Sequence, residues 1–532
     1  MEILARLQNQ ANQIKQIHLR DLLSQRERNQ VCTANFENIL FDYSHSKVCQ
    51  TTLDLLGEYA ISTGLFDKIR AMYEGQHINT TENRAVLHVL LRAQESQHPQ
   101  FPEVLQIRER IKEFANKVRN GEILGVTGKP LFNILCIGIG GSYLGPEFVA
   151  EALKTEPNCM RESIGRNLRF LANVDPVDFL RATHELDPEE TLVVIISKTF
   201  TTAETMMNAR KATAWLTSHI TSHPSEKVIE HHVCAVSSNL QKTKEFGIQD
   251  ERVFGFWDWV GGRYSVTSAV GLVPLYLHYG AQIDLFLQGA NSIDRLFLEK
   301  ANLNQWKENI PLLMGLLGWW NTQFLEYASR AVLPYSQALV RFAAHIQQLD
   351  MESNGKQCKK DGTPVEVSGP IVFGEPGTNG QHSFYQLMHQ GRIVQSEFIG
   401  FCQSHSSDSE AHNELMSNFF AQPDALALGK TTEELRKENC PDALIPHKMF
   451  KGDRPSFSLL FPALTVSACG QLLALYEHRV AVEGFLWDLN SFDQFGVELG
   501  KTLATKVKQA IASETFEGHP SENLLLHYIN HR

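Results

Sequence analysis

Two runs of the chain, residues 347–356 and 377–391, combine side-chain amides, hydroxyls and glycines with a carboxylate and a histidine. Both are flanked by apolar sequence of the kind that forms helices and strands. Amides and hydroxyls add little to packing, but they donate and accept the hydrogen bonds that a polyhydroxylated ligand needs. We therefore expect the chemistry of the protein here, with Glu352 and His389 as its acid–base candidates.

Both candidates are predicted at the ends of helices. Glu352 precedes Asn354-Gly355, a helix stop, and His389 precedes Gln390-Gly391, a glycine cap. A carboxylate at a helix C-terminus faces the negative end of the helix dipole, which suits a general base. Two plainer readings stay open at this point: Glu352 as a solvated surface side chain, and His389 as a structural histidine.

An anion cradle is predicted where strands end. Apolar runs typical of buried strands, each followed by small or hydroxyl residues, lie at residues 131–138, 191–196 and 231–236. In open α/β sheets ligands bind beyond the carboxyl ends of the strands. The second run leads into hydroxyls, one ammonium group and the start of a helix, whose free N–H groups attract anions; the side chains are Ser197, Lys198, Thr199 and Thr202.

The glycine-rich turn after the first run supports the same ligand. Gly140-Gly141-Ser142 lets the backbone approach a ligand that a side chain would block. The turn lacks the Gly-Lys-Ser/Thr ending of a nucleotide P-loop, and its glycine spacing breaks the dinucleotide fingerprint. With the hydroxyl cluster, a sugar phosphate is the favoured ligand. The alternative is structural: Thr199 and Thr202 as helix N-caps, and the glycines as a tight turn.

Two further segments carry candidate groups. Ser491 is predicted to cap a helix on which Gln494, Glu498 and Lys501 share one face. Arg263 follows two glycines among aromatic residues, as expected of a donor brought close to a ligand. The alternatives are an ordinary Glu498–Lys501 surface pair and a buried Arg263 paired with Asp258.

The elements that must position these groups alternate along the chain. Residues 1–110 are mostly polar and helix-patterned, and strand-like and helical segments then alternate, which predicts an α/β fold with doubly wound parallel sheets. The alternation restarts after about residue 330, and residues 456–478 are predicted to form one long apolar helix. A chain of 532 residues accommodates two to four domains.

Composition narrows the class of protein. The net charge of −11 does not suggest a nucleic-acid-binding face. No apolar run is long enough to span a membrane, and the N-terminus lacks the core of a signal peptide. The nine cysteines are scattered without a Cys-x-x-Cys pair, so we expect no structural zinc site and a reducing, cytoplasmic location.

In combination these motifs resemble the glucose-6-phosphate isomerase (phosphoglucose isomerase) family, from about residue 84 to residue 501. The matching runs, in order, are residues 138–146, 197–205, 261–265, 348–356, 377–391 and 492–501. Departures from the family pattern are small and remove no chemical group: Leu349, Thr267 and Phe495.

The resemblance implies a reaction, the reversible isomerisation of glucose 6-phosphate to fructose 6-phosphate through a cis-enediol, in glycolysis and gluconeogenesis. It implies a homodimer and no metal or organic cofactor. It also implies two sugar-isomerase (SIS) domains at residues 111–285 and 286–512, with a helical arm at residues 1–110 and a helical tail at residues 513–532.

The resemblance further implies a role for each candidate side chain. Glu352 moves the proton, Arg263 stabilises the enediolate, and His389, supplied by the other subunit, serves ring opening with Lys501. The substrate-binding side chains are Ser142, Ser197, Lys198, Thr199, Thr202, Gln348 and Gln494. Two alternatives remain at this stage: an isomerase for another sugar phosphate, such as mannose 6-phosphate, and a non-catalytic sugar-phosphate sensor.

Overall fold

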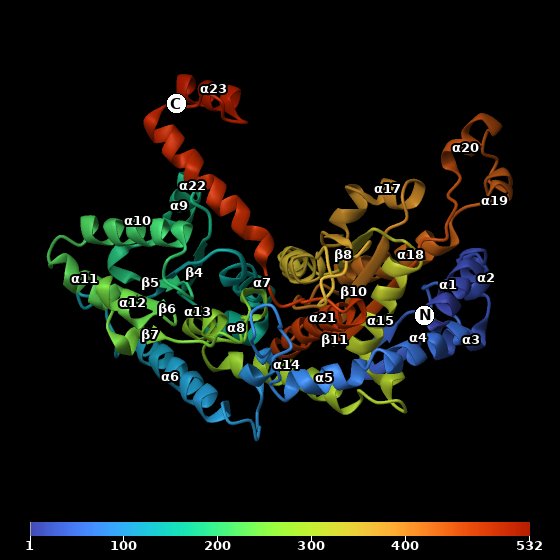
Figure 1. The fold of residues 1–532 in the computed structure, drawn as a ribbon, viewed down its shortest axis with the longest axis horizontal. Helices are drawn as coiled ribbons and strands as arrows, with labels where there is room; N and C mark the ends of the chain where they lie inside the picture. Colours follow the sequence, from blue (N-terminus) through green and yellow to red (C-terminus); the bar gives the residue numbers. More distant parts are fainter. Residues whose placement is uncertain (1) are drawn as a thin grey trace. The chain divides into compact units, whose positions relative to one another are not determined.

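The computed structural model describes residues 2–532 and divides into two units, Met1–Ser491 and Phe492–Arg532. The first unit contains both sheets (Figure 1). Its helices are α1 (Glu2–Lys15), α2 (Leu19–Leu23), α3 (Arg26–Val31), α4 (Gln50–Ser62), α5 (Leu65–Tyr73), α6 (Phe101–Arg119), α7 (Leu144–Leu153), α8 (Pro157–Glu162), α9 (Pro176–Thr183), α10 (Ala203–His219), α11 (Ser225–His232), α12 (Leu240–Glu245), α13 (Ala269–Tyr279), α14 (Ile283–Glu299), α15 (Ile310–Gln323), α16 (Phe342–Gln347), α17 (Tyr385–Gln390), α18 (Ser409–Leu428), α19 (Thr432–Lys437), α20 (Ile445–Lys448) and α21 (Val466–Trp487).

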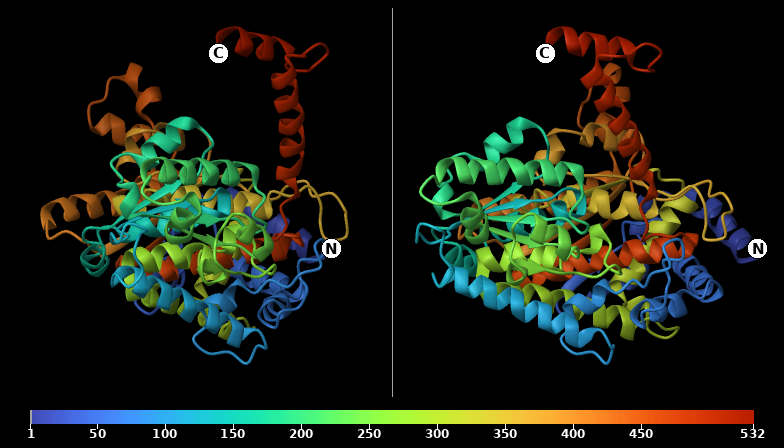
Figure 2. Two further views of the ribbon diagram at one scale, coloured as in Figure 1. Left: turned by 90° about the vertical axis from the view of Figure 1, so that its left-hand side faces the viewer. Right: turned by 60° about the vertical axis from the view of Figure 1, so that its left-hand side comes forward.

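The first sheet is wholly parallel, with the order β4-β3-β5-β6-β7. Its strands are β3 (Asn133–Ile137), β4 (Asn167–Leu171), β5 (Thr191–Ile196), β6 (Val233–Val236) and β7 (Val253–Phe254). Side chains of β3 and β5 are buried on both faces, because α10 covers one face and α13 the other (Figure 2). After β3 the chain forms β4 on one side of β3 and then β5 on its other side. The turns after β3 and β5 therefore flank the position where ligands bind in such sheets.

The second sheet is mixed, with the order β1-β2-β11-β10-β8-β9. Its strands are β1 (Thr33–Phe36), β2 (Ile39–Asp42), β8 (Ser329–Pro334), β9 (Ile371–Phe373), β10 (Gln395–Gln403) and β11 (Ser456–Ala463). Strands β8 to β11 are parallel, and β2 pairs antiparallel with β11. Helix α21 is buried along nearly its whole length and packs on α14 and α15.

The α/β fold class is confirmed, and two predictions of secondary structure are corrected here. Residues 1–110 are not wholly helical, because β1 and β2 form a hairpin whose turn residues Glu37 and Asn38 have φ of 45° and 66°, as a tight two-residue turn requires. Residues 456–478 are not one helix, because β11 ends at Ala463 and α21 begins at Val466, capped by the Thr465 side chain.

The second unit holds α22 (Glu498–Ser513) and α23 (Glu522–His531). Ser491 does not cap α22, which begins at Glu498 after a 3-10 turn at Phe495–Val497. Gln494 therefore precedes the helix and does not share a helical face with Lys501. Among residues 2–532, no helix combines the length and apolar character that crossing a bilayer requires.

Candidate active site

Glu352 lies on a wide helical turn that also carries buried polar side chains. Helix α16 continues into a π-helical turn, Gln348–Glu352, and helical backbone persists to Asn354. Such turns insert an extra residue and are frequent at functional sites. Asp350, Ser353 and Asn354 are fully buried, whereas the Glu352 side chain is 22% exposed. The turn thus presents one accessible carboxylate from an otherwise immobilised segment.

Asp350 ties this turn to the core. Its Oδ2 accepts hydrogen bonds from Arg330 Nη1 at 2.6 Å and from Arg479 Nη2 at 2.7 Å. Both guanidiniums are fully buried and also pair with Glu397 and Glu483. Burial raises the pKa of Glu483 to about 7, because three carboxylates share only two guanidiniums away from water. Removing one member would leave buried charge uncompensated, so the cluster fixes the turn.

Ser353 and Asn354 lock the other side of the turn. Arg263 Nε donates to Ser353 Oγ at 2.6 Å, and the Tyr264 hydroxyl lies 3.2 Å from the same oxygen. Asn354 Nδ2 donates to the Val480 carbonyl at 3.0 Å, and its Oδ1 accepts from Ser491 Oγ at 2.8 Å. Neither Ser353 nor Tyr264 was predicted as a site residue. A serine and an asparagine within a helical stretch next to Glu352 are the sequence signal for these contacts.

Arg263 reaches the carboxylate from a 3-10 turn, Gly262–Tyr264. It is 1% exposed, and its Nη1 lies 3.3 Å from Glu352 Oε1 while Nη2 donates to the Ser491 carbonyl at 2.5 Å. The alternative pairing with Asp258 is wrong, because that carboxylate lies instead 3.9 Å from Arg84 Nε. A fixed cation beside a carboxylate can stabilise negative charge that develops on a substrate oxygen.

Two glycines let the turn after β3 approach both the Arg263 turn and the Glu352 turn closely. A Cβ on Gly141 would lie 2.2 Å from the Gly262 carbonyl carbon, so the two backbones touch. A Cβ on Gly140, whose φ is +58°, would lie 3.2 Å from Gln348 Nε2. The Gln348 Oε1 atom is buried and has no hydrogen-bond partner among the described residues, which leaves an acceptor for a ligand. Ser142, in the same turn, is half-buried.

The predicted anion cradle follows β5. Ser197 Oγ donates to Thr202 Oγ1 at 3.4 Å, and Thr202 occupies the N-cap position of α10 without its side chain capping the helix. The capping alternative is therefore wrong for Thr202. The Thr199 hydroxyl is exposed and lies 2.6 Å from that of Thr201. Lys198 Nζ donates to the Asp258 carbonyl at 3.2 Å, and burial lowers the pKa of Lys198. These groups could hold a phosphate.

His389 lies on α17, a different element from those that carry Glu352 and Arg263. It is half-buried, with its ring 5.3 Å from that of Phe450, and burial lowers the pKa of His389. Arg454 Nη2 donates to its carbonyl at 3.4 Å. Within the described residues no hydrogen bond or ion pair joins His389 to Glu352.

Gln494 and Lys501 belong to the second unit. Lys501 is exposed near the start of α22, and no residue of that helix is buried. Across residues 2–532, no group of three or more His, Cys, Asp or Glu side chains could hold a metal ion.

Comparison with known proteins identifies the family. A family model described as "Phosphoglucose isomerase" matches residues 42–525. The cytosolic glucose-6-phosphate isomerases of Arabidopsis thaliana and Zea mays are each 52% identical over 530 residues, which is 97% of this chain and 93% and 92% of those proteins. A crystal structure of a glucose-6-phosphate isomerase from Chlamydia trachomatis covers 100% of this chain and 98% of its own, with 33% identity and a TM-score of 0.84. The chain belongs to the phosphoglucose isomerase family.

Proposed function

We propose that this protein interconverts glucose 6-phosphate and fructose 6-phosphate in glycolysis and gluconeogenesis. The observation that carries the proposal is the Arg263–Glu352 pair, with Nη1 and Oε1 3.3 Å apart. The same π-helical turn carries Gln348, whose amide oxygen is unpaired. An aldose–ketose exchange needs one base that takes and returns a proton, and a cation near the oxygens. The names of the relatives support the same substrates and a cytoplasmic location.

In the proposed mechanism Glu352 removes the proton from C2 of the open-chain aldose. The electron pair forms the C1–C2 double bond of a cis-enediol, and the carbonyl oxygen at C1 takes up the negative charge beside Arg263. The proton on the C2 oxygen passes to the C1 oxygen, and Glu352 returns its proton to C1 as the C2 oxygen becomes the ketose carbonyl. Atoms balance without a redox partner, because the proton leaves and returns on one carboxyl group.

The remaining candidates are assigned to binding and ring opening. The cradle binds the phosphate, and this contact supplies binding energy remote from the reacting carbons. The residues of the cradle are Ser142, Ser197, Lys198, Thr199 and Thr202. Gln348 and Gln494 orient the sugar, and His389 with Lys501 opens the ring. These assignments rest on the family resemblance together with the hydroxyls and the ammonium group gathered after β5.

The direct test is a coupled assay on the purified protein, with fructose 6-phosphate supplied and glucose 6-phosphate detected. We expect turnover that is unchanged by EDTA. A comparison of kcat/KM for mannose 6-phosphate in the same assay distinguishes the two sugar specificities. Absence of glucose 6-phosphate formation would contradict the proposal, and a higher kcat/KM for mannose 6-phosphate would redirect it.

We also propose a homodimer in which His389 completes the partner's site, and SIS-type domains at residues 111–285 and 286–512. The lack of any hydrogen bond or ion pair between His389 and Glu352 among the described residues of one chain supports the first part, and the separate sheets support the second. Mixing E352Q and H389A chains tests the trans arrangement. One site of each mixed dimer then keeps both groups, so activity should recover to about a quarter of wild type. No recovery in demonstrated mixed dimers contradicts it.

A further inference from the structure

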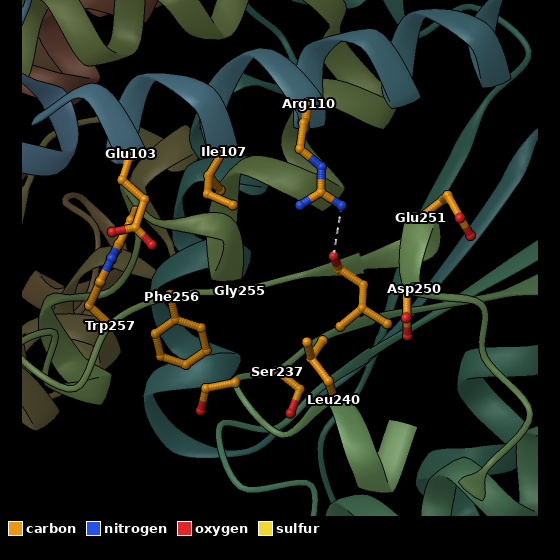
Figure 3. A pocket seen from close by; sticks show the side chains of 12 residues that line it. Glu103, Ile107, Arg110, Ser237, Leu240, Asp250, Glu251, Gly255, Phe256 and Trp257 are labelled. Carbon is orange, nitrogen blue, oxygen red and sulfur yellow. Dashed lines mark hydrogen bonds between the residues drawn. The ribbon is translucent and has the colours of Figure 1, made fainter. Parts of the chain in front are cut away.

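A cavity lies between helix α6, the loop after β6 and the segment around β7, and neither Glu352 nor Arg263 lines it. Its volume is about 530 Å³ (Figure 3). Helix α6 forms one wall with Glu103, Ile107 and Arg110, whose spacing of four and three places them on one helical face. The other walls come from the loop after β6 and from the segment around β7, with Ser237, Ser238, Leu240, Asp250, Glu251, Val253, Gly255, Phe256 and Trp257.

Carboxylates lie at opposite ends of this cavity. Glu103 lies beside Trp257 at one end, and Asp250 and Glu251 lie at the other (Figure 3). Among the described residues none of these three carboxylates takes part in an ion pair. The single cation, Arg110, is already engaged: Nη2 donates to the Val253 carbonyl at 3.3 Å, and the guanidinium lies 5.7 Å from the Phe254 ring centroid. The lining therefore favours a ligand with positive charge at both ends.

The middle of the cavity is apolar. Ile107, Leu240 and the ring of Phe256 lie between the two acidic ends (Figure 3). An uncharged methylene chain can pack on such side chains, whereas a compact, strongly hydrated metal ion cannot use them. The indole of Trp257 adds a π face, which attracts an ammonium group. Charge at the ends and apolar surface between them match a linear diamine.

The floor of the cavity is shared with the anion cradle. Ser237 Oγ and Ser238 Oγ donate to the Lys198 carbonyl at 3.1 and 2.8 Å, and the Ser238 amide donates to the same oxygen at 3.1 Å. The ring of Phe256, which lines the cavity, lies 5.6 Å from Lys198 Nζ. A cation bound here would add positive potential behind Lys198 and so strengthen the attraction of the cradle for a phosphate.

We propose that this cavity binds a linear diamine or polyamine, with its ammonium groups at Glu103 and Asp250 and its methylene chain on Phe256, and that occupancy tightens sugar-phosphate binding. The second part rests on the proposed function, while the first does not. No group of the proposed isomerase site lines the cavity, so the two can be tested separately.

Isothermal titration calorimetry with spermidine tests the site on the full chain. At fixed ionic strength we expect one spermidine per chain, and no saturable binding of n-butylamine or Mg²⁺. Binding should weaken about tenfold in E103Q and in D250N, the loss of one charge-assisted contact. It should be unchanged in E109Q, which removes an exposed carboxylate from α6 outside the cavity. Absence of binding, or equal weakening in E109Q, overturns the site in favour of diffuse attraction to an acidic protein.

The fructose 6-phosphate assay tests the coupling. Spermidine should lower KM severalfold without changing kcat, and the effect should vanish in E103Q, whose activity without spermidine stays normal. An unchanged KM despite calorimetric binding overturns the coupling alone. A wild-type protein that binds spermidine but does not turn over fructose 6-phosphate instead overturns the proposed isomerase function.

Discussion

The turn that carries Glu352 is fixed by buried polar contacts, whereas the anion cradle after β5 has few contacts of its own. Around Glu352, Asp350 and Ser353 are fully buried and engage three guanidiniums. In the cradle the hydroxyls of Ser197 and Thr202 share one long contact of 3.4 Å, and Thr199 is exposed. Proton transfer demands a fixed geometry, because small misplacements of the reacting atoms cost rate. A phosphate instead needs several donors that remain free to bind it. The comparison separates residues that set kcat from residues that set KM.

Substitution E352Q should have the largest effect. It preserves shape but removes the proton acceptor, so we expect kcat for fructose 6-phosphate to fall by about 10³ to 10⁴ with KM little changed. Steady-state kinetics measure this. E366Q, which removes an exposed carboxylate nearby in sequence, is the matched control and should behave as wild type. A kcat near normal in E352Q contradicts the assignment of the base.

Substitution D350N should destabilise the protein most. Asparagine leaves Arg330 and Arg479 short of one compensating charge, and breaking a buried ion pair costs about 3–5 kcal/mol. Urea unfolding measures the free energy of unfolding. The exposed control D21N should change it by less than about 0.5 kcal/mol. Equal stability of D350N and D21N would show that the cluster does not anchor the turn.

Substitution R263Q should lower kcat by about 10² to 10³, because the enediolate loses its nearby positive charge. KM should change little, since the phosphate contacts stay in place. R263K keeps a charge but loses the planar fork that reaches Ser353, Ser491 and Glu352 together, so it should recover only part of the rate. A loss confined to KM would place Arg263 in substrate binding instead.

Substitution T202A should have the smallest effect, on KM alone. A hydrogen bond to a charged group contributes about 1.5–3 kcal/mol, so KM should rise about 10- to 100-fold with kcat nearly constant. T217A, on the same helix α10 but far from its N-terminus, should leave KM unchanged. A comparable fall in kcat for T202A would remove the distinction between cradle and turn.

The sequence predicted the strands around the cradle well. The run predicted at residues 191–196 is β5, and those at residues 131–138 and 231–236 contain β3 and β6. These runs are apolar on both faces and end at small residues, so their length and their boundaries identify them as buried strands. Composition and position alone also pointed to Ser197 and Thr202 as ligand-binding candidates.

The failures occurred where long-range contacts decide local structure. Residues 456–478 are apolar throughout, and nothing in their period shows that β11 pairs with β10 before α21 begins. Ser491 resembles an N-cap but bonds instead to Asn354, more than a hundred residues away. Asp350 and Ser353 were not singled out, because their partners Arg330, Arg479 and Arg263 lie elsewhere in the chain.

Deuterium exchange tests the central claim most directly, that Glu352 moves the proton between C2 and C1. Substrate is incubated with enzyme in D₂O, and nuclear magnetic resonance follows deuterium at these carbons. Wild type should introduce deuterium at C1 of fructose 6-phosphate and C2 of glucose 6-phosphate, because a carboxyl proton exchanges with solvent. E352Q should introduce essentially none, while still binding the sugar phosphate. Exchange at the wild-type rate in E352Q would contradict the account.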